Sequence, residues 1–334
     1  MIDMLVMRCR FRQGWQDFNL RELGIPLQAT IHPDGQTGSL RHAWEVIPSS
    51  LGSLAMKVFF NPESKLDPDP WLEIKGSPAK LIQGHNVWGS EHLGRSAYRM
   101  IEVLFEAYPS LFSELDQGTW TVAQVDVTYH SRARSPTEAT QFINALQHVS
   151  KGQTKARSGY NGTAYFGKRN SRLRSIKVYD KYAEVLAYLE HERRRGDPQK
   201  VARHFSAELI EWTKGMIRWE ATVKTRWLER RGYPTALHEL AKVFDPRVVW
   251  RACLEDLFEA LEGQDMRLRT DEDVLEALKG RFHTLNTRTG KLSYGAAMAA
   301  YRTYRAIKAE GWDQVKEVTT SSTLSRHIGI RSSR

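Results

Sequence analysis

Strict alternation of apolar and polar residues is the feature that most constrains the fold of this chain. It occurs in three segments, "QVDVTYH" (124–130), "RSIKVYDK" (174–181) and "IRWEATVK" (217–224). Successive side chains of a β-strand point to opposite faces, so each segment is expected to be a strand with one buried and one polar face. If the three strands share one sheet, their polar residues must gather on a single face of it.

The chain changes character about two thirds of the way along. Short strand signals and amphipathic helical segments are mixed at first, whereas the last third has helical periodicity only. We therefore predict an α+β fold. Residues 1–232 are expected to form an antiparallel-rich sheet with flanking helices, and residues 233–334 a smaller, all-helical region.

Composition restricts the class of partner. The chain has 49 Lys and Arg against 39 Asp and Glu, for a net charge of +10, which favours nucleic acid first and an anionic membrane second. Its two cysteines, Cys9 and Cys253, form no CxxC pattern and lie among apolar neighbours, as is typical of free thiols in a reducing compartment. No apolar run approaches the ~18 residues that a membrane span needs. We expect a soluble protein of the cytoplasm.

The shared polar face would carry two carboxylates, Asp126 and Glu220, together with Tyr179, Lys177 and Lys181. Carboxylate oxygens are suitable ligands for Mg²⁺ or Mn²⁺. A tyrosine beside a metal ion and cationic side chains loses its proton more easily and can attack phosphorus, and lysines can hold the phosphate. The alternative interpretation is that these residues are ordinary solvated positions of a sheet.

A basic turn precedes Tyr179. The segment "GTAYFGKR" (162–169) nearly matches a phosphate-binding P-loop, but Arg169 stands where that motif needs Ser or Thr, and its interior is typical of a strand. We predict a β-hairpin here. Its basic residues Lys168, Arg172 and Arg174 are then expected to face a DNA backbone together with Arg169.

Four motifs together resemble one known family. The segments "KLIQGHNVWGS", "VDVTYH", "TAYFGKRNSRLRSIKVYDKYAEV" and "IRWEATVK" occur in the order, and at roughly the spacing, found in the filamentous-phage gene II replication initiators. The resemblance is loose over most of residues 1–310 and good over residues 80–225. A more distant resemblance connects the chain to the Rep_trans type initiators of small Gram-positive plasmids. Such proteins are site-specific, metal-dependent nickases.

The resemblance implies a chemistry. Tyr179 would attack a DNA phosphodiester to give a 5′-phosphotyrosine and a free 3′-OH that primes a polymerase. Around Tyr179, the resemblance implies that Asp126 and Glu220 are ligands of Mg²⁺ or Mn²⁺ and that Glu184 is a further acidic ligand candidate. It also implies that Lys181 and Arg174 lie near the scissile phosphate. Asp3 resembles an acid in the first strand of these families and has no assigned role.

Other basic residues are expected to contact DNA. They lie on the hairpin, on the strands and near the end of the chain: Lys168, Arg169, Arg172, Lys177, Arg218, Arg326 and His327. The segment "VTTSSTLSRHIGIRSSR" resembles the turn and recognition helix of a helix-turn-helix. Its glycine departs from the longer basic helix of the family, so a frayed basic tail is the alternative.

We predict a rolling-circle replication initiator that nicks and closes origin DNA in the cytoplasm of a bacterial host. Double- and single-stranded DNA are its expected partners, with a host polymerase or helicase and a second copy of the chain as further candidates and no membrane. The alternative is a non-catalytic, sequence-specific DNA-binding protein. A tyrosine recombinase is disfavoured because Tyr179 lies in the middle of the chain rather than near its end.

Overall fold

The computed structural model describes most of the chain, namely residues 1–12, 25, 27–60, 69–147, 150–151, 154–158, 162–167, 171–194, 203–261, 271–287, 290–310 and 312–328. The chain divides into two compact units, Met1–Gln264 and Asp265–Arg334. The expected division lay earlier, between residues 232 and 233. The difference comes from helices α10 (Leu237–Val243) and α11 (Pro246–Leu261), which pack on a helix and on the sheet of the first unit.

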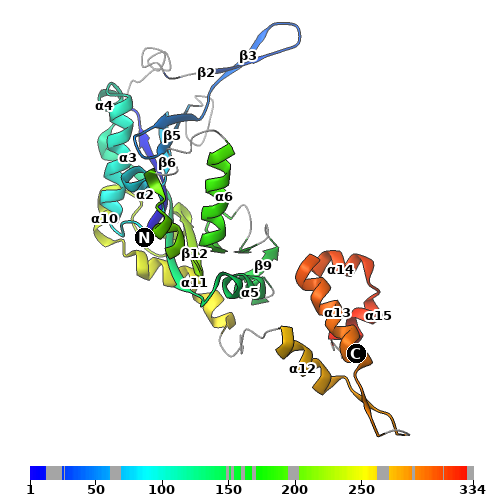
Figure 1. Cartoon of the computed structure of the whole chain (residues 1–334). Helices are drawn as coiled ribbons and strands as arrows, with labels where there is room; N and C mark the ends of the chain where they lie inside the picture. The colour runs from blue at the N-terminus through cyan, green and yellow to red at the C-terminus, as the bar shows by residue number, and fades with distance from the viewer. Residues whose placement is uncertain are drawn as a thin grey trace. The chain divides into compact units, whose positions relative to one another are not determined.

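A ten-stranded sheet with only antiparallel pairs forms the framework of the first unit, in the order β4-β5-β6-β1-β7-β12-β11-β10-β9-β8. Its strands are β1 (Ile2–Arg10), β4 (Glu45–Pro48), β5 (Ser53–Phe59), β6 (Trp71–Gly76), β7 (Thr121–Arg132), β8 (Ser150–Lys151), β9 (Thr154–Ser158), β10 (Thr163–Phe166), β11 (Arg174–Asp180) and β12 (Met216–Lys224). The three alternating segments are thus the neighbouring strands β7, β12 and β11, as predicted. A hairpin of β2 (Leu27–Ile31) and β3 (Thr37–His42) extends away from this sheet (Figure 1).

Helices cover the apolar face of the sheet. The helices of this unit, besides α10 and α11, are α2 (Pro78–Gln83), α3 (Leu93–Ala107), α4 (Leu111–Glu114), α5 (Pro136–Leu146), α6 (Lys181–Arg194), α8 (Ala207–Trp212) and α9 (Thr225–Arg230). Trp219 on the apolar face of β12 contacts the rings of Phe142 in α5 and Phe258 in α11. Helices α3 and α6 lie on opposite sides of the sheet (Figure 1). The predicted α+β class with an antiparallel sheet is confirmed.

The second unit is mainly helical, as predicted. It contains α12 (Asp271–Arg281), α13 (Gly295–Glu310), α14 (Trp312–Val318) and α15 (Ser321–Ile328). It also has a short hairpin of β13 (Thr284–Leu285) and β14 (Leu292–Ser293), which was not predicted because each strand is only two residues long. Within the described part of the chain, no helix combines the length and the apolar character that crossing a membrane requires.

Candidate active site

Tyr179, Glu220 and Asp126 share one face of the sheet. Tyr179 lies opposite Arg218, and Lys177 lies opposite Glu220, in the pairing of β11 with β12. Asp126 lies on β7 two residues from the partner of Glu220. Directly opposed residues of neighbouring strands point to the same side of a sheet. The structure therefore brings together the polar side chains that the alternation pattern assigned to one face.

The Tyr179 hydroxyl is hydrogen-bonded and covered. It donates to Oε2 of Glu220 over 3.3 Å, and the Lys177 ammonium lies 4.1 Å from the centre of the Tyr179 ring and 3.8 Å from the same Glu220 oxygen. The tyrosine is only 4% exposed. Burial and the neighbouring Glu220 charge raise the pKa of Tyr179 well above its ordinary value, whereas Arg218 lowers it. The phenol is therefore protonated at neutral pH and needs an acceptor for its proton before it can attack.

The two carboxylates of the face are poorly compensated. Burial raises the pKa of Asp126, and the charge of Glu220 raises it further. Burial also raises the pKa of Glu220, while Lys177 opposes the shift. Gln124 donates one hydrogen bond to Asp126 Oδ1 over 3.0 Å. A bound cation would relieve this accumulation of negative charge, so the donor set fits a hard divalent ion.

The protein supplies few ligands for such an ion. Among the residues with described positions, no three His, Cys, Asp or Glu side chains converge as a metal-ligand set. Glu184, the third ligand candidate, accepts a hydrogen bond from Lys181 over 2.5 Å instead. Mg²⁺ is often held by one or two carboxylates, with waters and substrate phosphates completing its shell. Asp126 and Glu220 fit that pattern without Glu184.

A β-bulge brings one more acid to this face. Ile2 lies opposite Val127 and Met4 lies opposite Asp126, so Asp3 is an extra residue on β1. Such a bulge re-aims a side chain that simple alternation would turn to the apolar side. Asp3 is 7% exposed and points to the polar face. The pattern of the sequence does not reveal this, which is why Asp3 had no predicted role.

Asn86 connects Asp3 to helix α6. Its side-chain amide donates to Asp3 Oδ1 over 2.8 Å, and its carbonyl accepts from the Lys181 ammonium over 2.9 Å. Lys181 is 1% exposed, and burial, together with the Arg218 charge, lowers its pKa to about 8. In the sequence, Asn86 lies within the segment "KLIQGHNVWGS", and nothing in the pattern assigns it a role. Its two bonds make it part of the site.

Arg218 is buried rather than available to DNA. It is 1% exposed, its Nη1 lies 3.5 Å from Asp3 Oδ2, and its Nη2 donates to the Val87 carbonyl over 2.7 Å. The prediction of a direct DNA contact is therefore not supported. Arg218 instead places a positive charge beside Tyr179, where it favours the phenolate.

Arg174 lies on the other side of the sheet. Its guanidinium donates to the carbonyls of Ala252 and Cys253 and pairs with Asp256, all in α11. The structure does not place it near Tyr179, contrary to the expectation. The reason is the alternation of β11, in which residues an odd number of positions apart face opposite sides.

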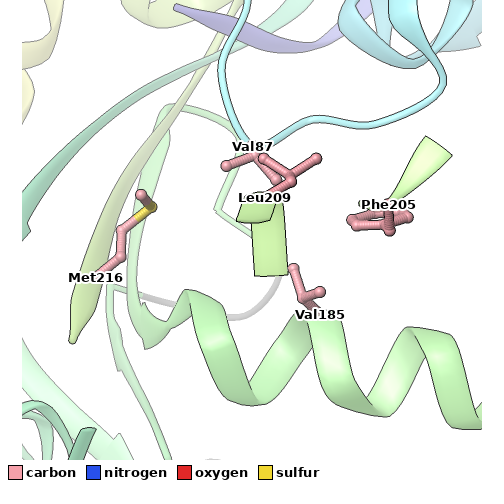
Figure 2. Close-up of a cluster of buried hydrophobic side chains, with 5 residues drawn as sticks. All are labelled: Val87, Val185, Phe205, Leu209 and Met216. Carbon is pink, nitrogen blue, oxygen red and sulfur yellow. The ribbon is translucent and has the colours of Figure 1, made fainter. Parts of the chain in front are cut away.

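A small hydrophobic cluster packs next to the polar face, to which Met216 belongs through the alternation of β12 (Figure 2). Its members are Val87, Val185, Phe205, Leu209 and Met216. They come from the loop after α2, from α6, from the segment around α8 and from the start of β12. Because Val87 follows Asn86 and Val185 follows Glu184, the cluster holds those two polar residues in place.

Asp180 caps the N-terminus of α6 directly after Tyr179. Its Oδ1 accepts hydrogen bonds from the backbone N–H groups of Tyr182 and Ala183 over 2.9 and 3.2 Å.

The remaining residues that were expected to contact DNA lie in different parts of the chain. Lys168 and Arg169 lie outside the described residues, and Arg172 is exposed in the loop before β11. In the second unit, α14 and α15 are joined by a short turn, and α15 occupies the position predicted for a recognition helix. It contains Arg326 and His327, and the His327 ring nitrogen Nδ1 lies 2.8 Å from Thr303 Oγ1 of α13. His327 is therefore engaged within the unit.

Comparison with known proteins gives a family. The family model for the N-terminal part of the replication-associated gene 2 protein matches residues 1–243. The chain is 29% identical to the replication-associated gene 2 protein of Enterobacteria phage M13, over 98% of this chain and 88% of that protein. It is 28% identical to the protein of the same description from Salmonella phage IKe, over 98% and 86%. No solved structure matches significantly. The chain therefore belongs to the family of replication-associated gene 2 proteins of filamentous phages.

Proposed function

We propose that this protein initiates rolling-circle replication by nicking one strand of origin DNA with Tyr179 and later closing it. One observation carries the proposal: the Tyr179 hydroxyl donates to Glu220 while Arg218 lies beside it on the same face. This arrangement pairs a nucleophile with a proton acceptor and a stabilising charge. Membership of the family of replication-associated gene 2 proteins supports DNA as the substrate.

The proposed step is a phosphoryl transfer. A bond forms between the Tyr179 oxygen and phosphorus, and the bond from phosphorus to the 3′ oxygen breaks. Glu220 takes the phenolic proton, because its Oε2 already accepts the hydrogen bond of the Tyr179 hydroxyl. The leaving 3′ oxygen takes a proton, for which the Lys181 ammonium is the proposed donor because its pKa is lowered to about 8. The products are a 5′-phosphotyrosine and a free 3′-OH, and no nucleotide is hydrolysed.

Charge on the phosphoryl group needs compensation. Asp126 and Glu220 would hold Mg²⁺ or Mn²⁺, which when bound would stabilise the charge that develops on the phosphoryl oxygens. Glu220 binds the Tyr179 hydroxyl through Oε2, which leaves its second oxygen for the ion. Because Tyr179 is covered by Lys177, an incoming phosphate would draw the Lys177 ammonium off the ring and use it as a DNA contact.

Partners follow from this reaction. Duplex DNA at the origin and the displaced single strand are the substrates, and a host polymerase would extend the 3′-OH. The reaction would take place in the host cytoplasm.

The test is nicking of supercoiled DNA that carries the phage origin. The wild-type protein should convert it to the open-circular form with Mg²⁺ and not in excess EDTA. Tyr179→Phe should abolish conversion while leaving DNA binding intact, because only the attacking oxygen is removed. Tyr182→Phe, a matched change three residues further along, should retain nicking. Wild-type nicking by Tyr179→Phe would disprove the nucleophile, and origin binding with no nicking by the wild type would favour the non-catalytic alternative.

A further inference from the structure

Two exposed tryptophans lie beside the candidate active site. Trp88 is 45% exposed and Trp212 is 40% exposed. Their ring centroids are 5.4 Å apart with an angle of 85° between the planes. The His130 ring centroid lies 5.7 Å from that of Trp212. Large aromatic side chains that cluster at the surface of a protein commonly mark a binding site.

Positive charge accompanies these rings. The Arg132 guanidinium lies 4.7 Å from the centre of the Trp212 ring, and its Nη1 donates to the Lys214 carbonyl over 3.4 Å. Lys214 itself pairs with Glu211 over 2.7 Å. We call Trp88, Trp212, His130 and Arg132 the aromatic platform. It offers flat apolar rings together with a guanidinium that can meet a phosphate.

Strand pairing places the platform next to Tyr179. His130 lies opposite Arg218 on β12, and Arg218 lies opposite Tyr179 on β11. All three side chains therefore point to the same face. Two strand spacings separate the backbones of His130 and Tyr179 by about 10 Å. That distance corresponds to about three nucleotides of a stacked DNA strand.

The platform is held by the core of the protein. Val87, which precedes Trp88, and Leu209, one helical turn before Trp212, both belong to the hydrophobic cluster of Figure 2. Gln83 also donates to the Trp88 carbonyl over 2.6 Å. The rings are thus positioned in advance, so a ligand that stacks on them does not have to order them first.

We propose that the aromatic platform stacks unpaired bases of the DNA strand within a few nucleotides of the phosphate that Tyr179 attacks. This inference rests on the proposed function of the site. Unpaired bases present their flat faces to aromatic rings, whereas paired bases of a duplex do not. The platform would hold a locally opened strand in the position for transfer, and Arg132 would contact its backbone.

The test measures base-dependent binding in EDTA, where no nicking occurs. The ligands are an oligodeoxythymidylate of about 16 nucleotides, an abasic strand of the same length and a duplex of the same length. The wild-type protein should prefer the thymidylate to the abasic strand. The double variant Trp88→Ala with Trp212→Ala should lose about 5- to 150-fold in affinity for the thymidylate. It should bind the abasic strand and the duplex as the wild type does.

Two further variants separate stacking from structure. Trp88→Phe with Trp212→Phe retains aromatic rings and should recover most of the preference for bases. Tyr98→Ala removes an exposed aromatic residue from α3, next to exposed Arg95, and should change nothing. An unchanged base preference in the double alanine variant would overturn the proposal, and so would an equal loss for all three ligands. Because binding is measured without catalysis, failure here is distinct from nicking by Tyr179→Phe, which would refute the proposed nucleophile instead.

Discussion

Basic residues of strand β11 have different partners on the two faces of the central sheet. On one side of β11, Arg174 is bonded to carbonyls and an acid of α11 and so fastens a helix to the sheet. On the other side, Lys177 lies over the Tyr179 ring and near Glu220. Both residues are close to Tyr179 in sequence, but only one is close to it in space. Closeness to Tyr179 in the sequence therefore does not identify a residue of the site. The face of the sheet to which its side chain points identifies it.

The faces also differ in which ionisable groups they bury, since the carboxylates and Lys181 lie on the polar face. On the polar face, burial raises the pKa values of Tyr179, Asp126 and Glu220 and lowers that of Lys181. Each shift favours the neutral form of its group and costs stability when the group is charged. A concentration of such groups is a feature of functional sites. The apolar face holds α5 and α11 by ring contacts and hydrogen bonds instead.

The largest expected effect is the loss of chemistry on the polar face. Glu220→Gln should lower the single-turnover nicking rate at saturating DNA by at least about 100-fold, because the amide neither accepts the Tyr179 proton nor offers a charge to Mg²⁺. Glu211→Gln, at an exposed position of α8, is the matched control and should retain the rate. Comparable rates for Glu220→Gln and the wild type would remove Glu220 from the mechanism.

The next effect contrasts Arg174 with Lys177. Arg174→Ala should lower the free energy of unfolding by about 1–3 kcal/mol, since it removes the hydrogen bonds and the ion pair with Asp256 that join β11 to α11, and should leave nicking at saturating DNA unchanged. Lys177→Ala should do the reverse, with little loss of stability and a nicking rate lower by about 10-fold. Denaturant unfolding and single-turnover nicking of both variants measure the contrast. A slow but fully stable Arg174→Ala protein would return Arg174 to the site.

A smaller effect concerns stability and pH. Because the folded-state pKa of Asp126 lies above its unfolded value, its contribution to stability is present at low pH and is lost as pH rises through the folded pKa. Asp126→Asn should therefore be more stable than the wild type at neutral pH in EDTA, by about 1 kcal/mol, and the difference should vanish at acidic pH. Thermal unfolding across pH measures this. A variant that is less stable at neutral pH would indicate that Asp126 is compensated in the folded protein.

The smallest effect is on binding. Arg172, exposed in the loop before β11, is expected to contact the DNA backbone. Arg172→Ala should lower the slope of log affinity against log salt by about one unit, equally for origin and random DNA. Replacing Arg174, which is half-buried and bonded to α11, should leave the slope unchanged. Measurements of DNA affinity over a series of salt concentrations test both variants. An unchanged slope for Arg172→Ala would show that Arg172 does not contact the DNA backbone.

Much of the fold was predictable from local pattern. Alternation identified β7, β11 and β12 and the shared face of Asp126, Tyr179 and Glu220, because burial of one side of a sheet enforces a period of two. The same period, applied strictly, would have excluded Arg174 from that face. What the pattern does not contain are departures from regular structure and contacts between distant segments.

Particular residues show this limit. Asp3 reaches the site only through a bulge, and Arg218 has the alternation of a surface residue but is enclosed by Asp3 and the loop at Val87. Helices α10 and α11 have no local signal that attaches them to the sheet rather than to the C-terminal helices. Each of these features depends on which distant segments pack together, and this packing cannot be predicted from the local pattern of a single sequence.

The central claim is that Tyr179 is the residue that becomes joined to DNA. The direct measurement is mass spectrometry of peptides after reaction with origin DNA in Mg²⁺, denaturation and nuclease digestion. The peptide containing Tyr179 should carry a nucleotide attached through its 5′-phosphate, and the Tyr179→Phe protein should give no adduct. An adduct on Tyr165 or Tyr182, or efficient nicking with no covalent adduct on any tyrosine, would contradict the account.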